Sequence, residues 1–140
     1  MEINYWAVLV CAVASMVIGA IWYGPLFGRK WMAINGANSD DIARREEMQK
    51  AAGPLYGVQF LLSLLQLYVL AQLIVWTGAE SKAVWVAFFM WLGFVMPTVA
   101  GLSMWTAQPA KVKWATFLIS SGYQFVSFFV FGFILGHWGA

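Results

Sequence analysis

The chain has 140 residues, of which 62% are hydrophobic, 18% aromatic and only 10% charged. A soluble domain carries about a quarter charged residues, so this composition excludes an ordinary water-soluble fold. The formal net charge of +2 is too small and too scattered for a nucleic-acid surface, and we expect no nucleic-acid partner. Cys11 is the single cysteine, so the chain cannot form an internal disulfide.

The apolar residues fall into four long blocks separated by short polar breaks. About 20 helical residues cross the roughly 30 Å hydrocarbon layer, and each block is that long. Helix is favoured over strand because backbone groups in lipid must bond within their own segment, and the blocks lack the alternation of a membrane barrel. The sequence therefore predicts an all-α membrane protein, a left-handed four-transmembrane-helix bundle forming one domain over residues 1–140. The predicted spans are residues 3–23, 55–76, 83–105 and 114–135.

The first span lacks the basic region of a secretory signal, so we expect it to be retained. Small side chains recur every four residues along it, at Ala7, Cys11, Ser15 and Gly19. Small residues at this spacing let two helix backbones approach closely in a membrane. Ser15 and Gly19 are therefore candidate helix-packing residues.

Residues 25–53 form the only sizeable polar segment. Asn38 or Ser39 can cap a short helix there, with acidic residues at its amino end and basic residues later, as the helix dipole favours. Trp31 ahead of it suggests a segment lying on the membrane surface. Such a helix is either a solvated connector or a docking element for a partner. The residues that fit this pattern are Asp40 and Asp41 at the amino end, and Arg44, Arg45 and Lys50 toward the carboxyl end.

The second span carries neutral polar side chains on one face. At 100° per residue they fall within an arc of about a quarter turn. These residues are Tyr56, Gln59, Ser63 and Gln66. The span is bounded by Gly53-Pro54 before it and Thr77-Gly78 after it, which are turn signals.

The third span has Gly93, Pro97 and Gly101 at four-residue spacing, a further candidate packing face. Pro97 removes one helical hydrogen bond and frees the carbonyl of Gly93, so we expect a kink with the Thr98 hydroxyl closing the gap. The kink is either a packing feature or a gate.

The fourth span repeats the polar pattern of the second and adds Gly132 and Gly136 as candidate packing residues. Its polar face is again about a quarter turn wide. The face consists of Thr116, Ser120, Gln124 and Ser127. The two polar faces are either a hydrogen-bonded seam between helices or a water-lined path for an uncharged solute.

Basic residues set the predicted orientation. Seven Lys and Arg lie in the first and third loops, against Lys82 alone in the second. By the positive-inside rule the first and third loops are cytoplasmic, and both termini are non-cytoplasmic. We expect the bacterial cytoplasmic (inner) membrane, with the termini facing the periplasm or exterior. Eight of the nine Trp lie near predicted span ends or in the first loop, and Trp91, the exception, is expected to pack against another helix.

Several motifs together resemble one known family. They are the run of residues 19–28 (GAIWYGPLFG) with Trp31, the residues Trp91-Leu92-Gly93-Phe94 with Pro97, and Gly122-Tyr123-Gln124 with Gly132, residues 134–136 and Trp138. The chain is similar in order, over nearly its whole length, to the small bacterial membrane family called domain of unknown function 1761. Gly24 departs from the Ser that this family often has before the Pro. The resemblance implies four spans and brings no activity.

The four predicted spans contain no Asp, Glu, Lys, Arg or His. Proton relays, Schiff bases and ion paths depend on such groups, so we expect no catalytic, metal or cofactor site and no enzyme activity. His137 lies at the outer rim, where an interfacial role is favoured over ligation.

The favoured function is a small scaffold or accessory subunit that associates in the lipid bilayer with itself or with a larger protein complex. The alternative is a homo-oligomeric channel or carrier for a small neutral solute. The first predicts that the polar faces of spans two and four meet; the second predicts a hydrated cavity reaching both sides.

Overall fold

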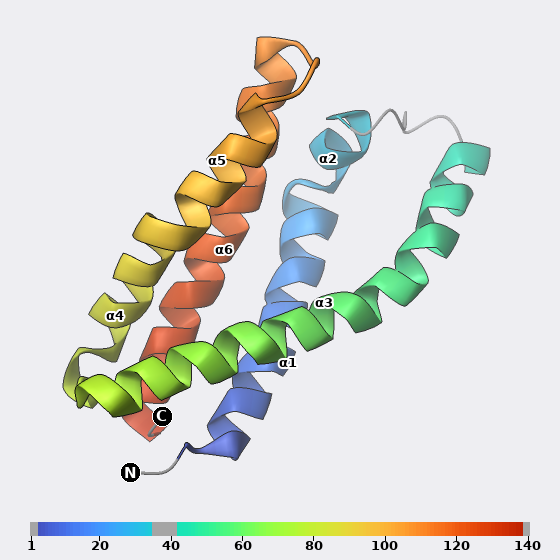
Figure 1. The fold of residues 1–140 in the computed structure, drawn as a ribbon. Coiled ribbons are helices and arrows are strands. Elements are labelled where there is room, and N and C mark those ends of the chain that lie inside the picture. The colour runs from blue at the N-terminus through green and yellow to red at the C-terminus, as the bar shows by residue number, and fades with distance from the viewer. Residues whose placement is uncertain (1–2, 35–41, 139–140) are drawn as a thin grey trace.

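The computed structural model describes residues 3–34 and 42–138, and the described residues form helices without strands (Figure 1). The prediction of an all-helical chain is confirmed. Short 3-10 (η2) and π-helical (η1, η3) turns join or interrupt the helices. In chain order the elements are α1 (Tyr5–Ile21), η1 (Trp22–Leu26), α2 (Gly28–Ile34), α3 (Ile42–Thr77), η2 (Glu80–Lys82), α4 (Ala83–Met90), η3 (Trp91–Val95), α5 (Met96–Met104) and α6 (Ala110–Trp138).

Within residues 3–34 and 42–138, four helical stretches are long and apolar enough to cross a membrane, as the composition predicted. In two of them a π-helical turn continues the helix: η1 extends α1, and η3 joins α4 to α5. The stretches are Tyr5–Leu26, Gly53–Thr77, Glu80–Met104 and Ala110–Trp138.

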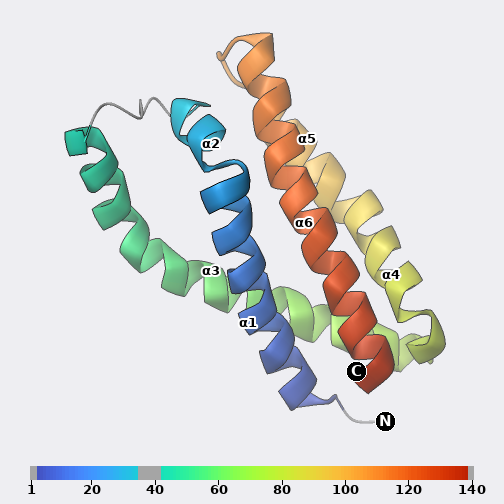
Figure 2. The same cartoon turned by 180° about the vertical axis from the view of Figure 1, so that it is seen from behind.

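Helix α6 is the centre of the molecule. Both α1 and the α4–α5 pair pack along it, whereas α3 crosses these helices obliquely and makes its main contact with α1 (Figures 1 and 2). Within the apolar window of each span, 44% of α6 is buried but only 11% of α4–α5. The oblique course of α3 differs from the left-handed bundle that we expected. As a result, only the second half of α3 supplies side chains to the core.

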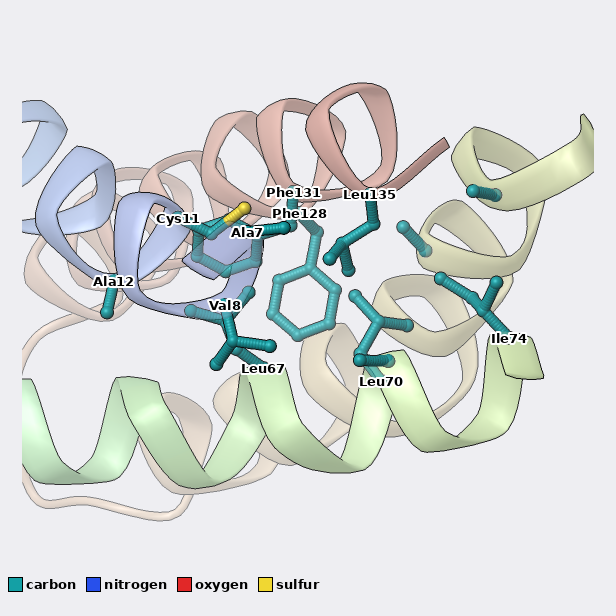
Figure 3. Close-up of a cluster of buried hydrophobic side chains, with 13 residues drawn as sticks. Ala7, Val8, Cys11, Ala12, Leu67, Leu70, Ile74, Phe128, Phe131 and Leu135 are labelled. Atoms are coloured by element: carbon teal, nitrogen blue, oxygen red, sulfur yellow. The ribbon is translucent and has the colours of Figure 1, made fainter. Parts of the chain in front are cut away.

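The apolar core lies toward the end of the molecule that carries the termini. Figure 3 shows Phe131 of α6, which is 1% exposed, among side chains of α1 and α3. Small residues of α1 and α4 let the larger side chains of α3 and α6 fill the space between the helices. The core consists of Ala7, Val8, Cys11, Ala12, Leu67, Leu70, Ala71, Ile74, Ala83, Ala87, Phe128, Phe131 and Leu135.

The first loop differs from the prediction. Residues 42–53 do not form a separate short helix, because α3 is one helix of 36 residues that continues through Pro54. Pro54 removes one backbone hydrogen bond, and the neighbouring residues Lys50 and Gly53 are exposed, so water can satisfy the freed carbonyl. The predicted caps Asn38 and Ser39 and the acidic residues Asp40 and Asp41 lie outside the described residues. A short helix does occur earlier, at α2.

Each of the two π-helical turns is associated with a proline. Pro25 lies inside η1, and Pro97 is the second residue of α5, which begins directly after η3. The wider turn accommodates the missing N–H of Pro97, and the Thr98 hydroxyl donates to the carbonyl of Phe94 at 2.6 Å. The expected irregularity at Pro97 is therefore a π turn, and Thr98 bonds Phe94 instead of the predicted Gly93.

Candidate functional site

Aromatic side chains from distant parts of the sequence converge on the middle of α6. The indole Nε1 of Trp22 donates to the carbonyl of Ile119 at 2.8 Å, and that of Trp91 donates to Ser121 at 3.1 Å. These bonds join η1 and η3 to α6. The prediction that Trp91 packs against another helix is confirmed, and Trp22, which lies near the end of its span, also turns inward against α6.

Tyr123 completes this aromatic cluster, which we define as Trp22, Tyr23, Trp31, Trp91 and Tyr123. Its hydroxyl donates to the carbonyl of Ser15 at 2.9 Å. Its ring lies 5.5 Å from that of Tyr23, whose ring is in turn 4.9 Å from that of Trp31. The cluster thus connects α1, η1 and α2 to α6.

Two glycines make room for this cluster. A Cβ atom on Gly122 would lie 2.9 Å from Cζ2 of Trp22, closer than real Cβ contacts allow, and one on Gly19 would lie 3.4 Å from the Tyr123 ring. Ser15, on the same face of α1 as Gly19, is 1% exposed. The small residues of α1 and α6 therefore let the indole and phenol rings reach the backbone carbonyls.

The polar face predicted for the second span has a mainly local role. Gln59 Nε2 donates to Ser63 Oγ within α3 at 3.4 Å, and Ser63 is buried. Tyr56 is 64% exposed, and Gln66 is half-buried.

The polar face predicted for the fourth span divides between two environments. Thr116 and Ser120 line a cavity at the loop end of α6. Gln124 is half-buried, and Ser127 is buried with no hydrogen-bond partner for its hydroxyl among the described residues.

The two polar faces do not form the shared seam that was expected. Helix α3 packs mainly on α1, whereas α6 packs on α1, α4 and α5. The side chains that α3 and α6 bring together in the core are apolar, such as Leu67 and Phe131. Hydrogen bonding between helices comes instead from the indole and phenol donors of the aromatic cluster.

The predicted packing residues separate into an inward and an outward group. A Cβ on Gly132 would lie 2.7 Å from Cα of Val84, and one on Gly136 would lie 3.2 Å from Cβ of Ala83, so α4 and α6 are in backbone contact. A Cβ on Gly93 or Gly101 would have no described atom within 4 Å apart from neighbouring atoms of its own helix. Their role as packing residues stays a prediction, since no other described helix lies against them and Pro97 between them is exposed.

Two cavities adjoin α6. A polar cavity of about 400 Å³ opens between α2, α5 and the start of α6, and is lined by Ile34, Val99, Leu102, Ser103, Thr106, Gln108, Val112, Lys113, Thr116 and Ser120. A second, almost wholly apolar cavity of about 370 Å³ lies between α4 and α6, lined by Val84, Trp85, Phe88, Trp91, Phe125, Phe128 and Phe129. The two share no lining residue. Within the described part of the chain, no three His, Cys, Asp or Glu side chains are grouped as metal ligands would be.

A family model described as "Protein of unknown function (DUF1761)" matches residues 6–136. The chain belongs to this family. The resemblance inferred from the sequence motifs is thereby confirmed, and the four membrane-length helices indicate that this DUF1761 protein is an integral membrane protein. Neither a curated protein nor a solved structure gives a significant match.

The motif residues of this DUF1761 chain include all five residues of the aromatic cluster and the two glycines, Gly132 and Gly136, of the α4–α6 contact. Sequence reasoning did not find the two indole hydrogen bonds or the polar cavity. The sequence analysis used Lys113 only as one of the basic residues of the predicted third loop, although it lies on the same helical face as Thr116 and Ser120. At 100° per residue the three fall within about 60°, which was the available signal.

Proposed function

We propose that this protein is a non-enzymatic subunit of a membrane assembly, a small scaffold or accessory protein that associates with itself or with a larger complex. The observation that carries the proposal is the outward face of the third span, which we define as Gly93, Pro97 and Gly101. Small residues at this spacing mark helix contacts in membranes, yet the two glycines meet no described atom within 4 Å.

The contrast with the other glycines supports this role. Gly132 and Gly136 bring α6 into contact with α4, so this chain uses small residues for close packing wherever it has a helix to pack against. The α4–α5 span is the least buried of the four. Because lipid chains are as apolar as Leu, van der Waals packing of one helix against another is the main gain available to this outward face.

Among the described residues, neither the seam of polar faces predicted for the scaffold nor the continuous cavity predicted for a conduit of a small neutral solute occurs, so only the outward face of the third span favours the scaffold. A conduit needs a hydrated cavity that reaches both ends of the spans. The polar cavity is lined at one end only, by residues of α2, of α5 and the turn after it, and of the start of α6. The apolar cavity does not continue it, since no residue lines both. A non-enzymatic role also fits the lack of ionisable side chains in the predicted spans.

We further propose that the protein lies in a bacterial cytoplasmic membrane with both termini outside and α2 at the cytoplasmic surface. Arg29 and Lys30 of α2 lie at the same end of the molecule as the start of α6 with Lys111, whereas η2 with Lys82 lies at the end that carries the termini (Figure 1). This distribution is the one that the positive-inside rule favours.

Cysteine cross-linking in membranes tests the association. Cys11 is fully buried, so it serves as a silent background for a single added cysteine. We expect Gly101→Cys to give a cross-linked product, either with a second copy or with a partner subunit. Leu62→Cys, on the exposed side of α3, is the matched control and should give none. Equal cross-linking at both positions, or a monomer in bilayers that also captures no partner, would overturn the proposal.

A further inference from the structure

We propose that the polar cavity binds the headgroup of an anionic membrane phospholipid, a site that does not depend on the proposed association. The cavity, of about 400 Å³, has a cation, several neutral hydrogen-bonding groups and an apolar wall. The side chains that line it therefore suit an amphiphile with a negatively charged head better than a neutral solute or an apolar ring.

The charge at the cavity favours an anion. Lys113 lines the cavity, and its side chain is half-buried. Arg29, Lys30 and Lys111 belong to the same end of the molecule (Figure 1), and residues 28–34 and 96–120 contain no Asp or Glu. Glu46 and Glu47 of α3 also belong to this end, but no residue of α3 lines the cavity. A bound phosphate diester would thus meet a positive field without a competing carboxylate from these segments.

The depth of the cavity places it at the headgroup layer. Trp105 is 92% exposed and Trp114 is 56% exposed, and tryptophans of this kind mark the boundary between water and hydrocarbon. Lys113 lies directly beside this boundary. The occupant at this depth is therefore a lipid of the surrounding leaflet.

The neutral polar groups continue from Lys113 into the membrane. Thr116 and Ser120 follow it on one face of α6, and Ser120 is about 10 Å deeper at 1.5 Å per residue. In a phospholipid the ester oxygens of the glycerol backbone lie below the phosphate. Hydroxyl groups at Thr116 and Ser120 are therefore at the depth where those acceptors occur.

The remaining wall suits an acyl chain. Val99 and Leu102 of α5 and Ile34 of α2 supply apolar lining to the cavity. Leu102 is 75% exposed, so this wall is continuous with the outer surface of the span. An acyl chain can leave the cavity along α5 without crossing a polar surface.

Lipid binding by the full-length protein tests the site. We expect native mass spectrometry of the detergent-solubilised protein to show tighter binding of short-chain phosphatidylglycerol than of phosphatidylcholine. Lys113→Gln should raise the Kd for phosphatidylglycerol about tenfold, the loss expected for one charge-assisted hydrogen bond. Lys82→Gln, which removes a cation at the opposite end, is the matched control and should leave that Kd unchanged.

A second variant separates the site from a general effect of charge. Thr116→Val keeps every charge and the side-chain shape, and we expect it to raise the Kd for both lipids about threefold. Wild-type affinity in both Lys113→Gln and Thr116→Val would overturn the proposal, and so would equal binding of the two lipids by the unaltered protein. Displacement of the lipid by an equal concentration of soluble glycerol phosphate would also overturn it, in favour of a free phosphate ester.

Discussion

At the scale of single residues, the aromatic donors are the distinctive feature of this protein. Trp22, Trp91 and Tyr123 each donate to a backbone carbonyl of another helix. These carbonyls lie within helices, so each bond adds a second donor to an acceptor that already belongs to a helical ladder. In lipid, where no water competes, such bonds fix how the helices are turned toward each other.

Replacing Tyr123 with Phe tests one of these donors. The variant keeps the ring contact with Tyr23 and loses only the bond to the Ser15 carbonyl. We expect the free energy of unfolding to fall by about 0.5–1.5 kcal/mol, the range for one hydrogen bond between membrane helices. Reversible unfolding from mixed micelles measures this change.

Tyr56 provides the matched control for this measurement. It is 64% exposed on α3, so Tyr56→Phe removes the same hydroxyl where no helix is packed against it. Its stability should stay within about 0.5 kcal/mol of the unaltered protein, as for most exposed substitutions. Equal losses in the two variants would mean that the Ser15 contact contributes nothing specific.

At the scale of the elements, α4 and α6 form the closest helix pair. Their backbones meet at Gly132 and Gly136, opposite Ala83 and Val84. Side chains larger than Gly would separate the helices along this contact, and the core around Phe131 and Leu135 lies beside it. The glycines therefore determine the distance between the central helix and the third span.

Gly132→Ala should weaken this contact. The new Cβ would lie 2.7 Å from Cα of Val84, a backbone atom that cannot turn aside, so α4 and α6 must move apart. We expect a loss of about 1–3 kcal/mol in the free energy of unfolding, typical of overpacking. Thermal unfolding followed by circular dichroism measures it.

Gly57→Ala is the control for this helix position. Gly57 also lies inside a helix, but no described atom comes within 4 Å of its added Cβ. Stability should be unchanged or higher by up to about 1 kcal/mol, since Ala favours helix over Gly. A loss in Gly57→Ala as large as that in Gly132→Ala would contradict a role for close packing.

The sequence predicted elements better than it predicted their contacts. Hydropathy and length identified the four membrane-length helices, because these depend on summed composition. The sequence did not predict that the irregularities at Pro25 and Pro97 are π turns. A proline shows only that one backbone hydrogen bond is lost, and not how the chain compensates for the loss. The continuous helix through Pro54 was missed because Gly53-Pro54 is a common turn signal. The four-residue steps from Gly93 through Pro97 to Gly101 equal the four-residue step from Gly132 to Gly136, so the sequence alone could not distinguish inward from outward faces.

At the scale of the whole molecule, the two ends differ in charge. The end with α2 and the start of α6 carries Arg29, Lys30, Lys111 and Lys113, and it also carries the start of α3 with Glu46 and Glu47 (Figure 1). The other end carries both termini and the turn with Glu80 and Lys82. The polar cavity opens at the first end and the apolar core lies toward the second. The orientation of the molecule in its membrane therefore decides which leaflet supplies the lipid that the cavity binds.

Single cysteines at the two ends test this orientation. Lys82, Arg29 and Lys111 are exposed, and Cys11 is fully buried, so an impermeant maleimide should react only with the cysteine that is added. We expect Lys82→Cys to react in intact cells or spheroplasts, and Arg29→Cys and Lys111→Cys to react only after the membrane is opened. Lys82→Cys leaves all seven basic residues of the other loops in place, so it cannot reverse the predicted orientation. Labelling of Lys111→Cys from outside would show that the orientation is the opposite of the one proposed. Labelling of Arg29→Cys and Lys111→Cys from opposite sides of the membrane would exclude a topology with four spans.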